Sequence, residues 1–120
     1  MIVLRKLKVS RMTEDNQRRL SRRAIQQSIT IVDVMTDQVL GRLVNIHREG
    51  FMLVGTGPVT VDSLYQLSLQ LSVPVNGQNQ IAVGGDCLWT RADEGGSQHW
   101  AGFHIIDISA QSLELIDALV

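Results

Sequence analysis

Residues 67–90 read LSLQLSVPVNGQNQIAVGGDCLWT, and this stretch decides the fold class. In its first half apolar and polar residues alternate, with the period of two that is typical of a strand with one buried and one wet face. The apolar set is Leu67, Leu69, Leu71 and Val73. Asn76-Gly77 readily supplies the two positive φ angles of a type I′ turn. Residues 80–90 are therefore expected to return antiparallel beside residues 67–73, with a bulge at Gly84-Gly85.

The segments before this hairpin also predict extended structure. Residues 28–34 (SITIVDV) and 39–45 (VLGRLVN) are rich in β-branched and aliphatic residues, and they enclose the turn formers Thr36-Asp37-Gln38. They predict a first hairpin. Residues 50–54 (GFMLV) predict a third run that ends at Gly55-Thr56-Gly57-Pro58.

The last part of the chain adds one strand and a helix. Residues 99–106 follow the turn at Gly95-Gly96 and predict the sixth strand. Ser109 or Asp107 can cap a short helix beyond it. Its apolar face is expected to hold Leu113, Ile116, Leu119 and Val120. We therefore expect an all-β domain, a small six-stranded antiparallel β-barrel with a short C-terminal helix, because closure removes the exposed edges of a sheet.

Length and composition indicate one globular domain. A chain of 120 residues with 44% hydrophobic and 19% charged residues can bury one core. The single Cys87 cannot form an intramolecular disulfide, and no apolar run approaches the roughly 20 residues of a transmembrane helix. The start of the chain lacks the features of a signal peptide. A cytoplasmic location is expected.

Charge is divided unevenly along the chain. The net charge is −1, but residues 1–23 carry eight basic and two acidic side chains, so the remaining residues carry −7. We interpret residues 1–23 as a flexible basic N-terminal arm and residues 24–120 as the barrel domain with its helix. The arm favours an anionic partner, with phosphates, nucleic acid and lipid headgroups as the physical options. The plain alternative is a solvated basic tail.

Two short motifs could carry chemistry. Arg18 and Arg22, and likewise Arg19 and Arg23, are four residues apart. Guanidinium groups bind phosphate oxygens in bidentate fashion and stack on bases, so paired arginines suit a nucleotide with two phosphates. The second motif is a turn between two strands, NIHREG at residues 45–50. Asn45 can read a base edge, and Gly50 would permit a backbone conformation closed to other residues.

The order of these motifs resembles the PilZ domain family, whose signatures are RxxxR and (D/N)xSxxG. Further matches are Trp89-Thr90-Arg91, Gly102-Phe103 and the run IDIS at residues 106–109, so that the resemblance spans residues 17–120. Leu20 matches the hydrophobic residue commonly found inside the arginine motif. This register makes Arg18 and Arg22 the principal pair, with Arg19 and Arg23 as auxiliary candidates.

The resemblance implies a receptor for cyclic di-GMP. The arm would fold over the barrel mouth, its arginines would meet the phosphates and guanine faces, and Asn45, His47 and Gly50 would contact the guanine edge. Such a domain binds without making or breaking a bond, so we expect no enzyme and no cofactor besides this ligand. The sequence departs from the family at His47, where serine is usual: imidazole can stack on guanine or support a phosphate, and it can equally block the pocket. The alternative is a degenerate adaptor that contacts only a protein partner.

Other readings of the sequence are less favoured. Cys87 has no second thiol or metal-spaced histidine near it and receives no role. His99 and His104 are five residues apart on one strand, hence on opposite faces, which argues against a shared metal ion. Nonspecific nucleic-acid binding by the arm is a third hypothesis, and neither nucleic acid nor a membrane is the expected partner. Residues 1–15 have no assigned role.

Overall fold

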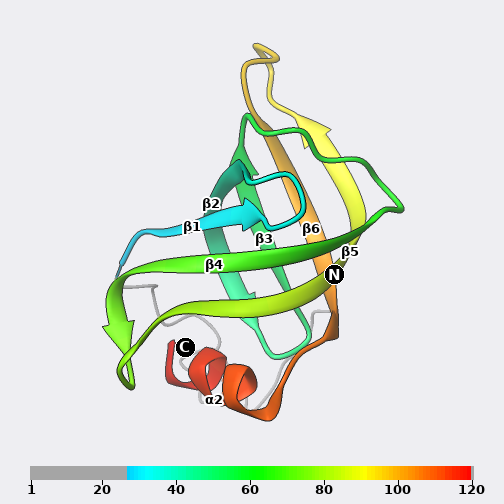
Figure 1. Ribbon diagram of the computed structural model, residues 1–120. Coiled ribbons are helices and arrows are strands. Elements are labelled where there is room, and N and C mark those ends of the chain that lie inside the picture. Colours follow the sequence, from blue (N-terminus) through cyan, green and yellow to red (C-terminus); the bar gives the residue numbers. More distant parts are fainter. Residues whose placement is uncertain (1–26, 120) are drawn as a thin grey trace, which may run out of the picture.

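The computed structural model describes residues 27–119, which form six strands and one helix. The strands are β1 (Ile29–Asp33), β2 (Gln38–His47), β3 (Gly50–Gly55), β4 (Leu64–Val75), β5 (Gln78–Ala92) and β6 (His99–Asp107), and the helix is α2 (Ala110–Leu119). All neighbouring strands are antiparallel, and the sheet closes in the order β1-β2-β3-β6-β5-β4. Helix α2 lies at one end of the barrel (Figure 1). The predicted fold class is confirmed.

The hairpin of β4 and β5 forms as its turn sequence predicts. Asn76 and Gly77 both have positive φ, 51° and 78°, as a type I′ turn requires. The pairing of β5 with β6 shifts between Gly84 and Gly85, where a bulge was expected, and again between Cys87 and Trp89. Such irregularities increase strand curvature, and they let the long strand β5 pair with β4 along one part and with β6 along another.

The core fills the barrel with the inward residues of all six strands. Leu67, Leu69 and Leu71 are buried as predicted, and the Phe51 and Phe103 rings stack with their centroids 5.0 Å apart. Val73 was expected to join them but is 57% exposed. Regular pairing of β4 with β5 breaks after Gln70, so Val73 lies beyond the core.

Helix α2 closes one end of the barrel. The Ser112 N–H donates to Ser109 Oγ over 3.0 Å, which makes Ser109 the cap of the two candidates. Ile116 and Leu115 are the residues most deeply buried, with Leu119 partly buried against the core. The predicted face omitted Leu115, because the angle at which a helix packs on a barrel is not set by its own sequence. Val120 lies outside the described residues.

The first described residue, Gln27, is bound to β4 through its side chain, and we call this contact with Val73 the latch. The Gln27 carboxamide donates from Nε2 to Val73 O over 2.9 Å and accepts from the Val73 N–H over 2.8 Å. It therefore prolongs the ladder between β1 and β4. The basic arm at residues 1–23 and the boundary at residue 24 lie outside the described residues. Within residues 27–119, no helix is long and apolar enough to cross a bilayer.

Candidate functional site: an outward face on β2, β3 and β6

The second motif lies mostly in a strand rather than in a turn, which corrects the expectation from sequence. Strand β2 runs on to His47, so only Arg48 and Glu49 form the turn. The pairing of β2 with β3 shifts between Leu43 and Asn45, and this irregularity changes which residues point outward. Asn45 and His47 flank the buried Ile46 and are both exposed on the outside of the barrel.

Gly50 is needed for a different reason from the one expected. The glycines with positive φ are Gly77 and Gly96, so Gly50 has a backbone conformation open to other residues. A Cβ at this position would lie only 2.6 Å from the carbonyl oxygen of Phe103 on β6. The close approach of β3 and β6 is therefore what requires glycine here.

Strand register places further residues beside the motif. His47 pairs with Gly50, which in turn pairs with His104 on β6. The two exposed histidines therefore lie on either side of the buried Gly50, two strand spacings or roughly 10 Å apart. Sequence reasoning treated His104 as an ordinary strand histidine. Gly102 and His104 are two residues apart and therefore lie on one face of their strand. Pairing that strand with residues 50–54 would have placed His104 beside the second motif.

A second row of paired residues lies one step along the same face. Asn45 pairs with Met52, and Met52 pairs with Gly102. A Cβ at Gly102 would overlap the indole of Trp89, so this ring covers Gly102 from β5. Trp89 is 41% exposed. The outward residues of these strands are called the motif face below: Asn45, His47, Gly50, Met52, Gly102 and His104.

The motif face presents exposed polar side chains that can form hydrogen bonds with a ligand. Asn45 offers both a donor and an acceptor, and its side chain is exposed. The Glu49 N–H donates to His47 Nδ1 over 3.2 Å, which orients the imidazole ring. The arrangement can bind a base edge through hydrogen bonds.

Positive charge is scarce in the described part of the chain. Residues 27–119 contain three arginines and ten acidic residues. Of the arginines, Arg48 lies 3.3 Å from Asp117 on α2 in an ion pair. Arg18, Arg19, Arg22 and Arg23 lie outside the described residues, so their placement beside the motif face stays a prediction.

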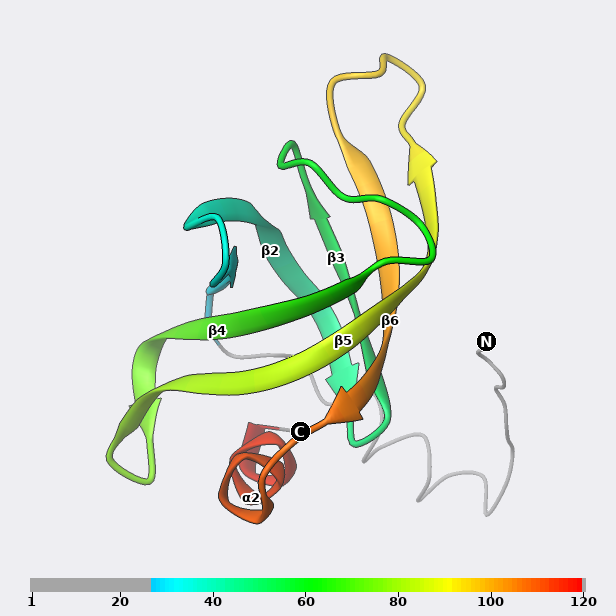
Figure 2. The same ribbon diagram turned by 45° about the vertical axis from the view of Figure 1, so that its right-hand side comes forward.

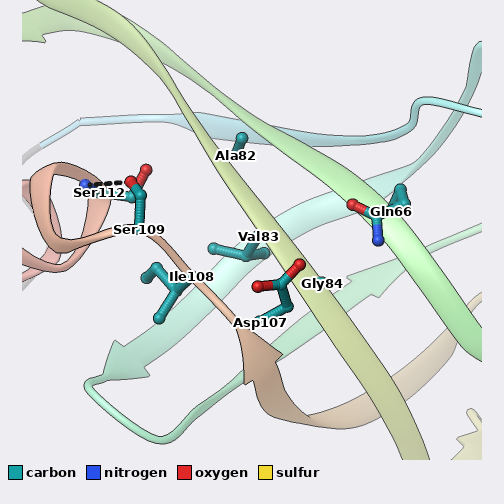
Figure 3. Close-up of a pocket in the computed structure, with 8 residues that line it drawn as sticks. All are labelled: Gln66, Ala82, Val83, Gly84, Asp107, Ile108, Ser109 and Ser112. Atoms are coloured by element: carbon teal, nitrogen blue, oxygen red, sulfur yellow. Dashed lines mark hydrogen bonds between the residues drawn. The ribbon is translucent and has the colours of Figure 1, made fainter.

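A depression of about 260 Å³ lies elsewhere, beside the start of α2 (Figure 3). Its walls come from β4, β5, the end of β6 and the first turn of the helix: Gln66, Ala82, Val83, Gly84, Asp107, Ile108, Ser109 and Ser112. The Asp107 carboxylate repels phosphate groups. This depression shares no residue with the motif face and is a poor site for a nucleotide.

Cys87 is more deeply buried than expected, with no exposed surface. Its thiol donates to the carbonyl oxygen of Trp89 over 3.6 Å. Burial raises the pKa of the Cys87 thiol above its ordinary value, and a smaller contribution from the Trp89 backbone lowers it. The thiol is therefore a core group rather than a nucleophile.

The fold and this face together define a small closed-barrel domain with a candidate site on its outside. The family model of the PilZ domain matches residues 17–120, so the chain belongs to the PilZ domain family, a family of binding and adaptor domains. The structure is similar to that of the Bacillus subtilis inhibitor of motility (MotI/DgrA), with a TM-score of 0.57 and 13% sequence identity. The match covers 76% of this chain but 43% of that one, less than half its length. Comparison with curated proteins finds no match.

Proposed function

We propose that the chain is a cyclic di-GMP receptor in the cytoplasm, and that ligand binding at the motif face changes its contact with a protein partner. One observation carries the proposal: Asn45 and His47 are exposed on the outside of β2, beside Gly50 of β3, in a chain of this family that also has the paired arginines upstream. The guanine edge would meet the exposed side chains of Asn45 and His47.

The charge distribution supports a role for the arm. Cyclic di-GMP carries two phosphates, whereas residues 27–119 carry a net charge of −7. The barrel alone would repel such a ligand. The cations must then come from the arm, whose net charge is +6. Arg22 is five residues before the latch at Gln27, a reach of up to about 17 Å along an extended chain.

The test is isothermal titration with cyclic di-GMP, with GTP as the control ligand. We expect saturable heat from cyclic di-GMP alone. The double variant Arg18→Ala/Arg22→Ala should bind at least about 100-fold more weakly, because charge-assisted hydrogen bonds contribute about 1.5–3 kcal/mol each. The matched control is Lys6→Ala/Lys8→Ala, which removes the same charge outside the family match at residues 17–120 and should bind nearly normally. Equal affinity of the two double variants would refute the proposed use of the arginines.

The motif face is tested separately. Asn45→Ala should weaken binding about 10-fold or more, since a polar group of the guanine edge loses its partner. Asn79→Ala is the control, because Asn79 is also an exposed strand asparagine but lies at the start of β5. His47→Ser, which restores the family motif, should keep binding within about threefold if the imidazole takes over the role of serine.

The alternative function is an adaptor that has lost the nucleotide and acts through protein contacts alone. The presence of His47 where the family usually has serine favours it. The adaptor would be supported by a folded protein that gives no heat with cyclic di-GMP. In addition, the amount of protein partner recovered in a pull-down should not change with the nucleotide or with the arginine variants. Binding restored by His47→Ser would identify the imidazole as the cause.

A further inference from the structure

Within residues 27–119, the last part of β5 has a neighbouring strand on one side only. Strand β6 pairs with it through residues 99–102. On the other side, β4 and the loop before it accompany β5 only as far as Cys87, whose carbonyl accepts the Asp62 N–H over 2.8 Å. Among the drawn elements, no strand lies along the outer side of residues 88–92 (Figure 2). We call residues 88–92 the open edge.

The pairing with β6 determines which residues of the open edge direct their N–H and C=O groups away from β6. The Asp93 N–H donates to the carbonyl oxygen of Gln98, toward β6, over 2.9 Å. Pairing is unbroken from Trp89 to Ala92, and successive residues of a strand direct their backbone groups to alternate sides. Thr90 and Ala92 therefore direct N–H and C=O groups outward. Such groups are a template for another strand.

We propose that a second copy of this chain pairs with the open edge, antiparallel and centred on Thr90. The length of the edge sets this register, because Cys87 is already covered at one end and β5 ends at Ala92 at the other. Full overlap of two such edges brings Thr90 opposite the partner's Thr90. The two threonines then exchange a pair of N–H to C=O bonds across the twofold axis.

The side chains are complementary to themselves in this register. Trp89 lies opposite the partner's Arg91, and directly opposed residues share one face of a sheet with their Cβ atoms about 5 Å apart. One face of the indole covers Gly102, and Trp89 is 41% exposed, which leaves its other face for the guanidinium. The twofold axis repeats this pair. None of the ten acidic residues of the described range lies in the open edge, so this edge avoids the repulsion that the rest of the barrel would impose.

The test is sedimentation equilibrium without nucleotide, from about 5 to about 500 µM. This concentration range is needed because an interface formed only by residues 88–92 of two chains is expected to be small and weak. The average mass should rise from one chain toward two. Thr90→Pro should abolish this rise: it removes the N–H that points away from β6, so the barrel loses no backbone bond. Arg91→Ala should weaken self-association at least about fivefold by removing the cation–π pair twice. Arg42→Ala, which removes another exposed strand arginine, is the matched control and should behave like the unmodified protein.

Three outcomes would overturn the proposal. The first is a protein that stays monomeric at about 500 µM. The second is self-association that Thr90→Pro leaves unchanged; if circular dichroism shows that this variant is misfolded, an unchanged Arg91→Ala has the same force. The third is self-association that ignores both variants but is lost when residues 1–26 are removed, which would assign the contact to the arm. Each leaves the nucleotide titrations untouched, so the two proposals fail separately.

Discussion

The contact between Trp89 and Gly102 makes a quantitative prediction through a double-mutant cycle. In Gly102→Ala the new Cβ would overlap the indole, which must move off β6. Overpacking of this kind costs about 1–3 kcal/mol. Trp89→Ala should cost roughly 3 kcal/mol, since a little more than half of a large aromatic side chain is buried.

The two effects should not add. With alanine at position 89 the space above Gly102 is open, and the φ angle of Gly102 is not positive. Gly102→Ala should then be neutral or should stabilise the protein by up to about 1 kcal/mol, because alanine restricts the unfolded chain. The expected coupling is about 2–3 kcal/mol, measured from urea unfolding followed by the fluorescence of Trp100, which remains in every variant. An equal cost of Gly102→Ala with and without Trp89 would refute the packing described for this face.

Three further predictions concern Gly50, Cys87 and Arg48. Gly50→Ala should destabilise the fold by more than about 1 kcal/mol and weaken nucleotide binding, since its Cβ would lie 2.6 Å from Phe103 O; a normal urea midpoint would contradict this. Cys87 should react with iodoacetamide at least about 100-fold more slowly in the native protein than in denaturant. The raised pKa of Cys87 favours the neutral thiol in the folded state, so the free energy of unfolding should fall as pH rises above 9.0, the ordinary pKa of the thiol. Cys87→Ala should remove this pH dependence. Arg48→Ala should change the unfolding free energy by less than about 1 kcal/mol, because both partners of its ion pair are largely exposed, and a larger loss by thermal unfolding would exclude a simple surface pair.

Local sequence determined the parts of the fold that depend on neighbouring residues. The turn at Asn76-Gly77 and the alternation of Leu67, Leu69 and Leu71 need no distant information, and both were predicted correctly. The capping bond of Ser109 is equally local. The outward position of Val73 was missed because it depends on where β4 leaves its neighbours.

The candidate site was predictable only in part. The resemblance identified Asn45, His47 and Gly50, but the predicted strand ended at Asn45 and left His47 in a turn, whereas β2 runs on to His47. Simple alternation would put Asn45 on the same face as the buried Leu43, and only the shift in pairing between them turns Asn45 outward. His104 joins the motif face through the register of β3 with β6, which is a nonlocal property that no single segment encodes.

The carboxamide of Gln27 has a mechanical consequence for signalling. Because it occupies backbone positions beside Val73, it fixes residue 27 to the edge of β4 by two hydrogen bonds. Nucleotide binding would then alter the surface without straining the sheet. The backbone amide chemical shifts of the barrel should therefore be the same with and without ligand away from the motif face, which would make the barrel a fixed platform for the ligand.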